Sequence, residues 1–203
     1  MHKLIFLFIF IIGTVQWSVS QSFKTEEIPY DVTLLAQQID AHTSTDTITI
    51  YELNDEFFKE IIAQSEKDYH LLVLYADWCK PCIEKMDSIR FMELKNKNVN
   101  FYYFSADKSR RIPVIADYLR KNDILTPTFI LSEEYKRNVK RRFTRFRDQI
   151  CSNCEDILGF PSFILFDKQM NVLFKKYGRN DGIRELFREF IIAFITSRVG
   201  KIF

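Results

Sequence analysis

The segment that most restricts the fold of this chain is an apolar run that ends at a pair of cysteines. Residues 71–75 are an unbroken apolar stretch of strand length, which is typical of a strand buried on both faces of a sheet. The sequence Ala-Asp-Trp-Cys-Lys-Pro-Cys follows at once, over residues 76–82. Pro81 suits the first turn of a helix, where a missing backbone N–H is no loss. The pattern predicts a central strand, a short turn and a helix that begins at the cysteines.

The rest of the chain alternates between strand patterns and helix patterns. Strands are predicted at 47–51, 99–104, 128–131, 162–166 and 171–177, and helices after Asn54, over 81–94, over 112–121, between Tyr135 and Cys154, and over 183–195. The last two strands are joined by residues 167–170 alone, which indicates a β-hairpin. Helices between strands and a closing hairpin predict an α/β sandwich around a central mixed sheet.

The composition is that of a globular protein and argues against a nucleic-acid partner. Of the 203 residues, 47% are hydrophobic, which is enough for a sizeable core. Lys and Arg number 29 against 27 Asp and Glu, so the formal net charge is only +2. A charge this small supplies no field for binding nucleic acid.

Residues 1–20 have the features of a signal peptide. Residues 1–3 are basic, residues 4–12 are apolar, and residues 18–20 resemble a cleavage site. The apolar run is short for a bilayer span, and an uncleaved anchor over residues 4–15 is the alternative. We therefore predict a protein that is periplasmic or secreted after cleavage, with residues 21–45 as an N-terminal extension.

Cys79 and Cys82 lie where a thiol is expected to ionise readily. The thiolate is the nucleophile in disulfide exchange, and a helix N-terminus stabilises it through unpaired N–H groups and the positive end of the dipole. Lys80 adds a cation, and Trp78 shields the pair. We expect Cys79 to be the exposed attacking thiol and Cys82 the buried thiol that resolves a mixed disulfide. The alternative is a stabilising disulfide or half of a metal site, because C-x-x-C alone is a weak signal.

In this setting the motif resembles that of the thioredoxin superfamily, in particular the exported bacterial TlpA/ResA-like proteins. The similarity covers residues 47–197, and the TlpA/ResA-like branch carries an inserted element in its second half. The resemblance implies a thioredoxin-like domain over 46–203, with a helix, strand and helix inserted at about 112–155. It also implies a thiol–disulfide oxidoreductase that needs no cofactor beyond the disulfide of Cys79 and Cys82.

The family has a cis-proline opposite the cysteines, and two prolines compete for that position. Pro127 has the more thioredoxin-like neighbours but leads toward a helix. Pro161 opens directly onto the hairpin and terminal helix with which the family ends, so we assign the position to Pro161. By resemblance, Phe160 pairs through its backbone with an extended client, and Trp78 offers that client a hydrophobic lip. A bulky residue at position 160 departs from the small or β-branched residue that is usual there.

A second departure from the family concerns proton transfer. Thioredoxin has a buried carboxylate six residues before the first cysteine, where this chain has Val73. Asp77 and Glu84 are the candidate substitutes, together with water. The resemblance therefore does not imply the reducing power typical of thioredoxin.

A second C-x-x-C pair, Cys151 and Cys154, falls near the end of the predicted inserted helix. It could be an auxiliary redox pair that relays electrons to or from Cys79 and Cys82. We favour a local structural disulfide, because no helix begins after Cys151 to support a thiolate. Four cysteines could also bind one zinc ion, but nearly seventy residues separate the pairs, unlike the spacing of zinc ribbons. No metal site is predicted.

The inserted helix also carries a run of basic residues that are predicted to make its exposed side positive: Lys136, Arg137, Lys140, Arg141, Arg142, Arg145 and Arg147. Such a face is usually only solvated, although residues 135–150 could contact an acidic partner or an anionic membrane. The sequence thus predicts an exported enzyme that reduces or exchanges disulfides of exported proteins and is served by an unidentified thiol–disulfide partner. The alternative is a non-catalytic interaction module of the same fold whose disulfides are structural.

Overall fold

The computed structural model describes residues 23–27, 32–41, 48–124, 126–135, 138–178, 188 and 191–192. Its helices and strands, in chain order, are β1 (Phe23–Glu27), α1 (Val32–Asp40), β2 (Ile48–Leu53), α2 (Asp55–Gln64), β3 (Tyr69–Tyr75), α3 (Lys80–Lys95), β4 (Val99–Ser105), α4 (Ile112–Lys121), β5 (Thr128–Leu131), α5 (Val139–Ile150), β6 (Ser162–Asp167) and β7 (Val172–Tyr177). The predicted signal peptide and most of the predicted terminal helix lie outside the described residues.

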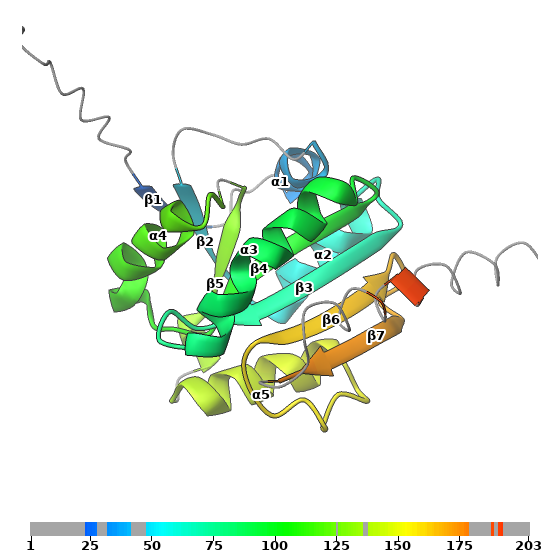
Figure 1. Cartoon of the computed structure of the whole chain (residues 1–203). Helices are drawn as coiled ribbons and strands as arrows, with labels where there is room; N and C mark the ends of the chain where they lie inside the picture. The colour runs from blue at the N-terminus through cyan, green and yellow to red at the C-terminus, as the bar shows by residue number, and fades with distance from the viewer. Residues whose placement is uncertain are drawn as a thin grey trace, which may run out of the picture.

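One mixed sheet of seven strands organises the molecule, in the order β1-β2-β5-β4-β3-β6-β7 (Figure 1). The pairs from β1 through to β3 are parallel, whereas β6 runs antiparallel to both β3 and β7. At the middle of β3, Val73 is paired with Tyr103 on one side and Phe163 on the other. The mixed sheet and the α/β sandwich are confirmed.

Helices cover both faces of the sheet, which explains why β3 is apolar at every position. Side chains alternate between faces along a strand. Leu71 and Val73 pack with α3 and α4 on one face. Leu72 and Leu74 pack with α1, α2 and α5 on the other face. Every residue of β3 is accordingly buried, so an unbroken apolar run is what a strand in this position requires.

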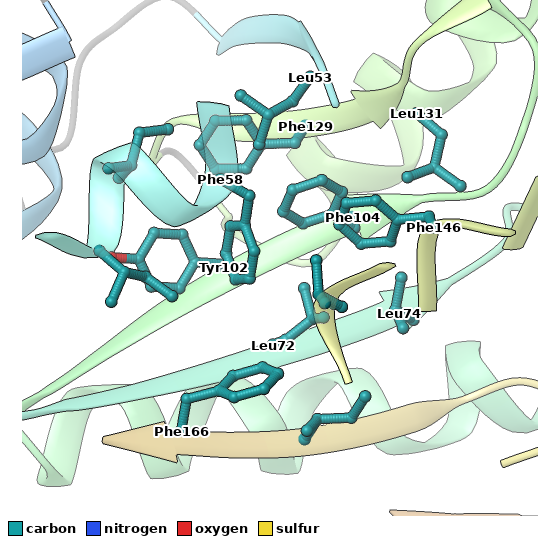
Figure 2. Packing of buried hydrophobic residues seen from close by; sticks show 14 of the residues in the cluster. Leu53, Phe58, Leu72, Leu74, Tyr102, Phe104, Phe129, Leu131, Phe146 and Phe166 are labelled. Atoms are coloured by element: carbon teal, nitrogen blue, oxygen red, sulfur yellow. The ribbon is translucent and has the colours of Figure 1, made fainter. Parts of the chain in front are cut away.

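Aromatic side chains fill the core beneath α2 and α5 (Figure 2). Phe58 of α2 meets Tyr102 of β4 edge to face, with ring centroids 5.3 Å apart. Phe146 of α5 stacks on Phe104 at 5.0 Å. The inserted helix is therefore part of the main core and not an appendage on its surface.

The predicted N-terminal extension contributes to the domain in the structure. β1 extends the sheet by pairing in parallel with β2. The buried residues of α1 pack in the same core as α2. At the end of α1, Asp40 accepts hydrogen bonds from Ser65 Oγ and from the side-chain amide of Asn100. These bonds tie the extension to the start of the central strands.

The predicted helix–strand–helix element is present as α4, β5 and α5. β5 enters the sheet between β4 and β2, a position that local sequence patterns do not specify. The second helix of this element, α5, ends at Ile150 with Cys151 as its C-cap, so it is shorter than predicted. On α2, Phe58 is buried, whereas its neighbour Phe57 is 40% exposed.

Candidate active site

Cys79 is the N-cap residue of α3, at the point where β3 gives way to that helix. Its sulfur accepts a hydrogen bond from Cys82 N at 3.2 Å, and its carbonyl accepts from Cys82 N and Ile83 N. Pro81 occupies the first turn of the helix, as its lack of an N–H predicts. Cys79 and Cys82 are joined by a disulfide with Cα atoms 5.2 Å apart. A backbone donor at the N-terminus of α3 therefore contacts the first sulfur.

The two sulfurs differ in access, although neither residue is exposed in this disulfide form. Cys79 is 5% exposed and Cys82 is 0% exposed, so the expectation of an exposed Cys79 is not met here. Cys79 does line a surface cavity, and Cys82 is not among the residues that line it. Lys80 points into solvent, with its Nζ 3.9 Å from Glu84. The opening toward solvent thus lies on the Cys79 side of the pair.

A buried carboxylate that sequence reasoning missed supports the turn before Cys79. Asp107 lies just after β4, beside the end of β3, because parallel strands end at one edge of the sheet. Its carboxylate accepts hydrogen bonds from Trp78 Nε1 at 2.9 Å, Asp77 N at 2.8 Å and Ser105 Oγ at 2.9 Å. Burial raises the pKa of this carboxyl group above its ordinary value. Asp107 holds the indole of Trp78 in place, although much of the Trp78 side chain is exposed to solvent.

The two carboxylates predicted as proton carriers are both engaged elsewhere. Asp77 accepts two hydrogen bonds from the Arg111 guanidinium, at 2.9 and 2.8 Å. Glu84 lies in solvent beside Lys80. Val73 is buried beneath the site and offers no carboxylate.

The peptide bond between Phe160 and Pro161 is cis, which confirms Pro161 rather than Pro127 as the cis-proline. Pro161 is buried, and its carbonyl accepts a hydrogen bond from Gly178 N at 3.2 Å. The Phe160 ring packs edge to face against Trp78 at 6.2 Å and Phe143 at 4.9 Å. Phe160 thus bridges the cysteine turn and the inserted helix, and this contact explains a bulky residue at the position.

Three segments enclose a cavity of about 700 Å³ beside the disulfide. The lining residues come from the start of α3, the start of α5 and the loop before β6: Trp78, Cys79, Lys80, Pro81, Asn138, Val139, Lys140, Phe143, Leu158, Gly159 and Phe160. The structure therefore brings together the predicted site residues Trp78, Cys79 and Phe160. The inserted helix α5 also forms one wall of the cavity, and this contribution to the site was not predicted.

The second cysteine pair lies in different surroundings. Cys151 and Cys154 form a disulfide just past the C-terminal end of α5. Both are buried in the core that contains α1, α2 and α5, whereas Cys79 and Cys82 belong to the core on the opposite face of the sheet. The sheet therefore separates the two disulfides.

The predicted basic face of the inserted helix is smaller in the structure, because two of its arginines are buried. Arg142 is 1% exposed, and its guanidinium donates to the carbonyl oxygens of Asp107, Leu131 and Ser132. Arg147 is also buried and donates to Ile157 O. Both guanidinium groups satisfy buried backbone carbonyls, a role that charge counting does not reveal. The exposed cations of α5 are Lys140, Arg141 and Arg145, while Lys136 and Arg137 lie outside the described residues.

Two features are absent from the part of the chain that the structure describes. They contain no group of three or more His, Cys, Asp or Glu side chains arranged to hold a metal ion. No helix within them has both the length and the apolar character needed to cross a membrane.

A thioredoxin family model matches residues 35–150, which is more than half of the chain. No curated protein matches the sequence. Solved structures with a similar fold include a secreted disulfide oxidoreductase of Mycobacterium tuberculosis homologous to DsbE of E. coli (11% identity, 60% of this chain and 79% of that chain, TM-score 0.44). A thioredoxin-family thiol:disulfide interchange protein from Chlorobium tepidum (17%, 62% and 79%, 0.47) and StoA from Bacillus subtilis (13%, 62% and 84%, 0.42) are also similar. On the family match, the chain belongs to the thioredoxin family.

Proposed function

We propose that this protein is an exported thiol–disulfide oxidoreductase that reduces or exchanges disulfides of exported proteins. One observation carries the proposal: the disulfide-bonded Cys79 is the N-cap of α3 and also lines a cavity. The same cavity is lined by Phe160, which precedes the cis bond at Pro161. A helix N-terminus stabilises a thiolate, and a cavity at that sulfur admits a second disulfide. A purely structural disulfide requires neither feature.

In the reducing direction the reaction has two exchange steps. The Cys79 thiolate attacks one sulfur of a client disulfide, forming a mixed disulfide and releasing the other client sulfur as a thiolate. Cys82 then attacks the Cys79 sulfur, which closes the Cys79–Cys82 disulfide and releases the second client thiol. Two electrons pass to the client, and water supplies protons to the released thiolates. A dithiol partner protein returns the pair to its reduced form by the same steps in reverse.

Client binding is assigned to Trp78, Phe160 and Pro161. Trp78 is 57% exposed, so a large apolar surface borders the reactive sulfur. The carbonyl of Pro161 is already bonded to Gly178 N, and we therefore assign main-chain pairing with an extended client to Phe160. The mutual contact of the Trp78 and Phe160 rings holds both sides of the entrance in place.

Export and partner contacts complete the proposal. We infer cleavage after residue 20 and a periplasmic or secreted location, as in the exported TlpA/ResA-like branch that the sequence resembles. Peripheral contact through the inserted helix would rest on Lys140, Arg141 and Arg145, because Arg142 and Arg147 are buried. Sequencing the N-terminus of the protein from the exported fraction tests the cleavage.

Trapping of mixed disulfides tests the enzyme. In a Cys82→Ala variant the mixed disulfide at Cys79 has no resolving thiol, so exported proteins are expected to stay covalently attached and to be released by reductant. The matched Cys79→Ala variant should trap nothing. The wild-type protein should also accelerate the reduction of insulin by a dithiol.

The competing function is an interaction module whose cysteines only staple the fold. It predicts no trapped protein with Cys82→Ala and insulin reduction no faster than the uncatalysed rate. Either result obtained with folded protein would contradict the proposed enzyme.

A further inference from the structure

We propose that the cavity beside Cys79 selects client segments that carry a bulky apolar side chain next to the disulfide cysteine and a carboxylate beyond it. The inference rests on the proposed function and names the clients that the site takes. Its three supports are the apolar walls of the cavity, the charge at its edge and the position of Cys79 within it.

The walls of the cavity are apolar and come from separate segments. Val139 and Phe143 of α5 line the cavity together with Leu158 and Phe160 of the loop before β6, and the Phe143 and Phe160 rings pack edge to face at 4.9 Å. Leu158 is 61% exposed, which leaves a large apolar side chain in water at the edge of the site. A client side chain of leucine or phenylalanine size would cover it and gain the free energy of apolar burial. A cavity of about 700 Å³ is large enough for such a side chain together with its neighbours in the peptide.

The charges at the cavity are all positive. Lys80 at the start of α3 and Lys140 at the start of α5 both line it, and none of the described residues in the lining is Asp or Glu. The Lys80 Nζ atom lies 3.9 Å from the carboxylate of Glu84, whose side chain is largely exposed. The N-terminus of α5, capped by Asn138, adds the positive end of a helix dipole on the Lys140 side. A client carboxylate is the complementary group, and a client lysine or arginine is disfavoured.

The position of Cys79 decides which part of a client reaches the cavity. Because Cys79 itself is part of the lining, a client cysteine bonded to it places its own neighbours in the chain against the walls. The first neighbour meets the apolar walls, and a residue one or two further along reaches Lys140. This geometry favours an extended polypeptide over a small disulfide, which would touch only the cysteine end.

Exchange rates with synthetic peptides test the inference. The full chain carrying Cys82→Ala is mixed with short single-cysteine peptides whose thiol is activated as a disulfide with thionitrobenzoate, and release of the coloured thiol is followed. The peptides carry Leu or Ser beside the cysteine and Glu or Lys two residues further on. At low salt we expect the Leu–Glu peptide to react about tenfold faster than the Leu–Lys peptide. Because exposed charges are screened, high salt should remove most of that ratio.

Two variants separate the contributions, with a matched control for charge. Lys140→Glu should reverse the preference between the Leu–Glu and Leu–Lys peptides. Arg141→Glu makes the same change of charge one residue along α5, outside the cavity lining, and should keep the preference. Leu158→Ser, at an exposed position, should reduce the advantage of Leu over Ser peptides by about threefold or more.

The outcomes distinguish client selectivity from the proposed disulfide exchange on which it rests. If all four peptides react at one rate, well above the rate with Cys79→Ala, the enzyme stands and the selectivity is wrong. An equal effect of Lys140→Glu and Arg141→Glu would also overturn the assignment to Lys140. If no peptide reacts faster than with Cys79→Ala, the proposed function itself fails.

Discussion

The two disulfides of this protein have the same spacing but lie at opposite ends of helices. Cys79–Cys82 opens α3, whereas Cys151–Cys154 follows the last turn of α5. Their Cα separations are 5.2 and 5.5 Å, and neither pair is appreciably exposed. Spacing and burial therefore do not distinguish them. The difference lies in the helix terminus and in the cavity that Cys79 of the first pair lines.

The C-x-x-C spacing by itself specifies only that the two cysteines can form a disulfide. At a helix N-terminus, free N–H groups and the dipole favour a thiolate, while a helix C-terminus presents carbonyl oxygens that disfavour it. The two pairs also belong to cores on opposite faces of the sheet, which argues against direct exchange between them. We therefore expect one pair to react and the other to stabilise.

The largest predicted effect is the loss of disulfide exchange on removing the first pair. Cys79→Ala should lower the rate of insulin reduction by about a thousandfold or more, to the uncatalysed level, because it removes the nucleophile. Cys151→Ala/Cys154→Ala should change this rate less than about threefold, since that disulfide lies across the sheet. If the second variant lost activity as fully as the first, Cys151 and Cys154 would be a redox relay.

Acid should weaken the fold that makes the two pairs different. His70, at the start of β3, is buried, and burial lowers its pKa to about 4. Its ring is held between the Tyr102 hydroxyl and the Lys67 carbonyl, each at 3.1 Å. Because the unfolded chain takes up this proton near pH 6.5, stability is full above that pH and falls as the pH drops toward 4. The loss reaches about 3 kcal/mol.

This acid effect is measurable by urea unfolding between pH 7 and pH 4. At pH 7 a phosphine reductant should reduce Cys79–Cys82 before Cys151–Cys154. At a pH low enough to unfold the domain, it should reduce both disulfides at the same time. His70→Gln should flatten the pH dependence of the unfolding free energy. An unchanged slope in that variant would show that other groups cause the loss.

Removal of the second disulfide should cost stability and little else. Closing so short a loop stabilises a protein by about 2 kcal/mol in the chain-entropy model, so Cys151→Ala/Cys154→Ala should lower the free energy of unfolding by about that amount. Urea unfolding of the oxidised proteins measures it. Cys79→Ala/Cys82→Ala removes a loop of the same length and is the matched control for the entropy. No change on removing Cys151–Cys154 would contradict a stabilising role.

The smallest predicted effect concerns the cation beside Cys79. The Lys80 side chain is 86% exposed, so water and salt screen its charge. Lys80→Gln should slow alkylation of reduced Cys79 by iodoacetamide only about twofold at neutral pH. A tenfold loss would mean that the lysine, and not the helix terminus, distinguishes the first pair from the second.

The central elements of the fold could be predicted because their signals are local. The apolar run over 71–75, the cysteines that follow it and the strand–turn–strand after Pro161 are each contained in a short segment. β1 was missed, because Phe-Lys-Thr-Glu-Glu is mostly polar and is a strand only through its pairing with β2. The helix pattern of α1 was present in Val32, Leu35, Ala36 and Ile39 and could have been found.

The parts of the site that were missed depend on residues distant in sequence. Asp107 accepts a hydrogen bond from Trp78 and lies just after the end of a neighbouring strand. That position after a strand was the one feature of the sequence that could have identified Asp107 as a site residue. Arg142 looks like any solvated arginine in the sequence, yet it is buried against carbonyls of other segments. Phe143 and Lys140 reach the cavity because α5 packs beside the loop at Phe160.

Residues 71–82 are enough to specify the reactive turn of this protein, because they encode a buried strand, two cysteines and a proline at a helix start. The proline with the cis bond could also be identified from the hairpin pattern after it. The residues that line the cavity beside Cys79, and the side of the sheet that holds each disulfide, follow from the tertiary structure alone. Those properties depend on how distant segments pack, and packing free energy is a property of the whole core and not of any one segment.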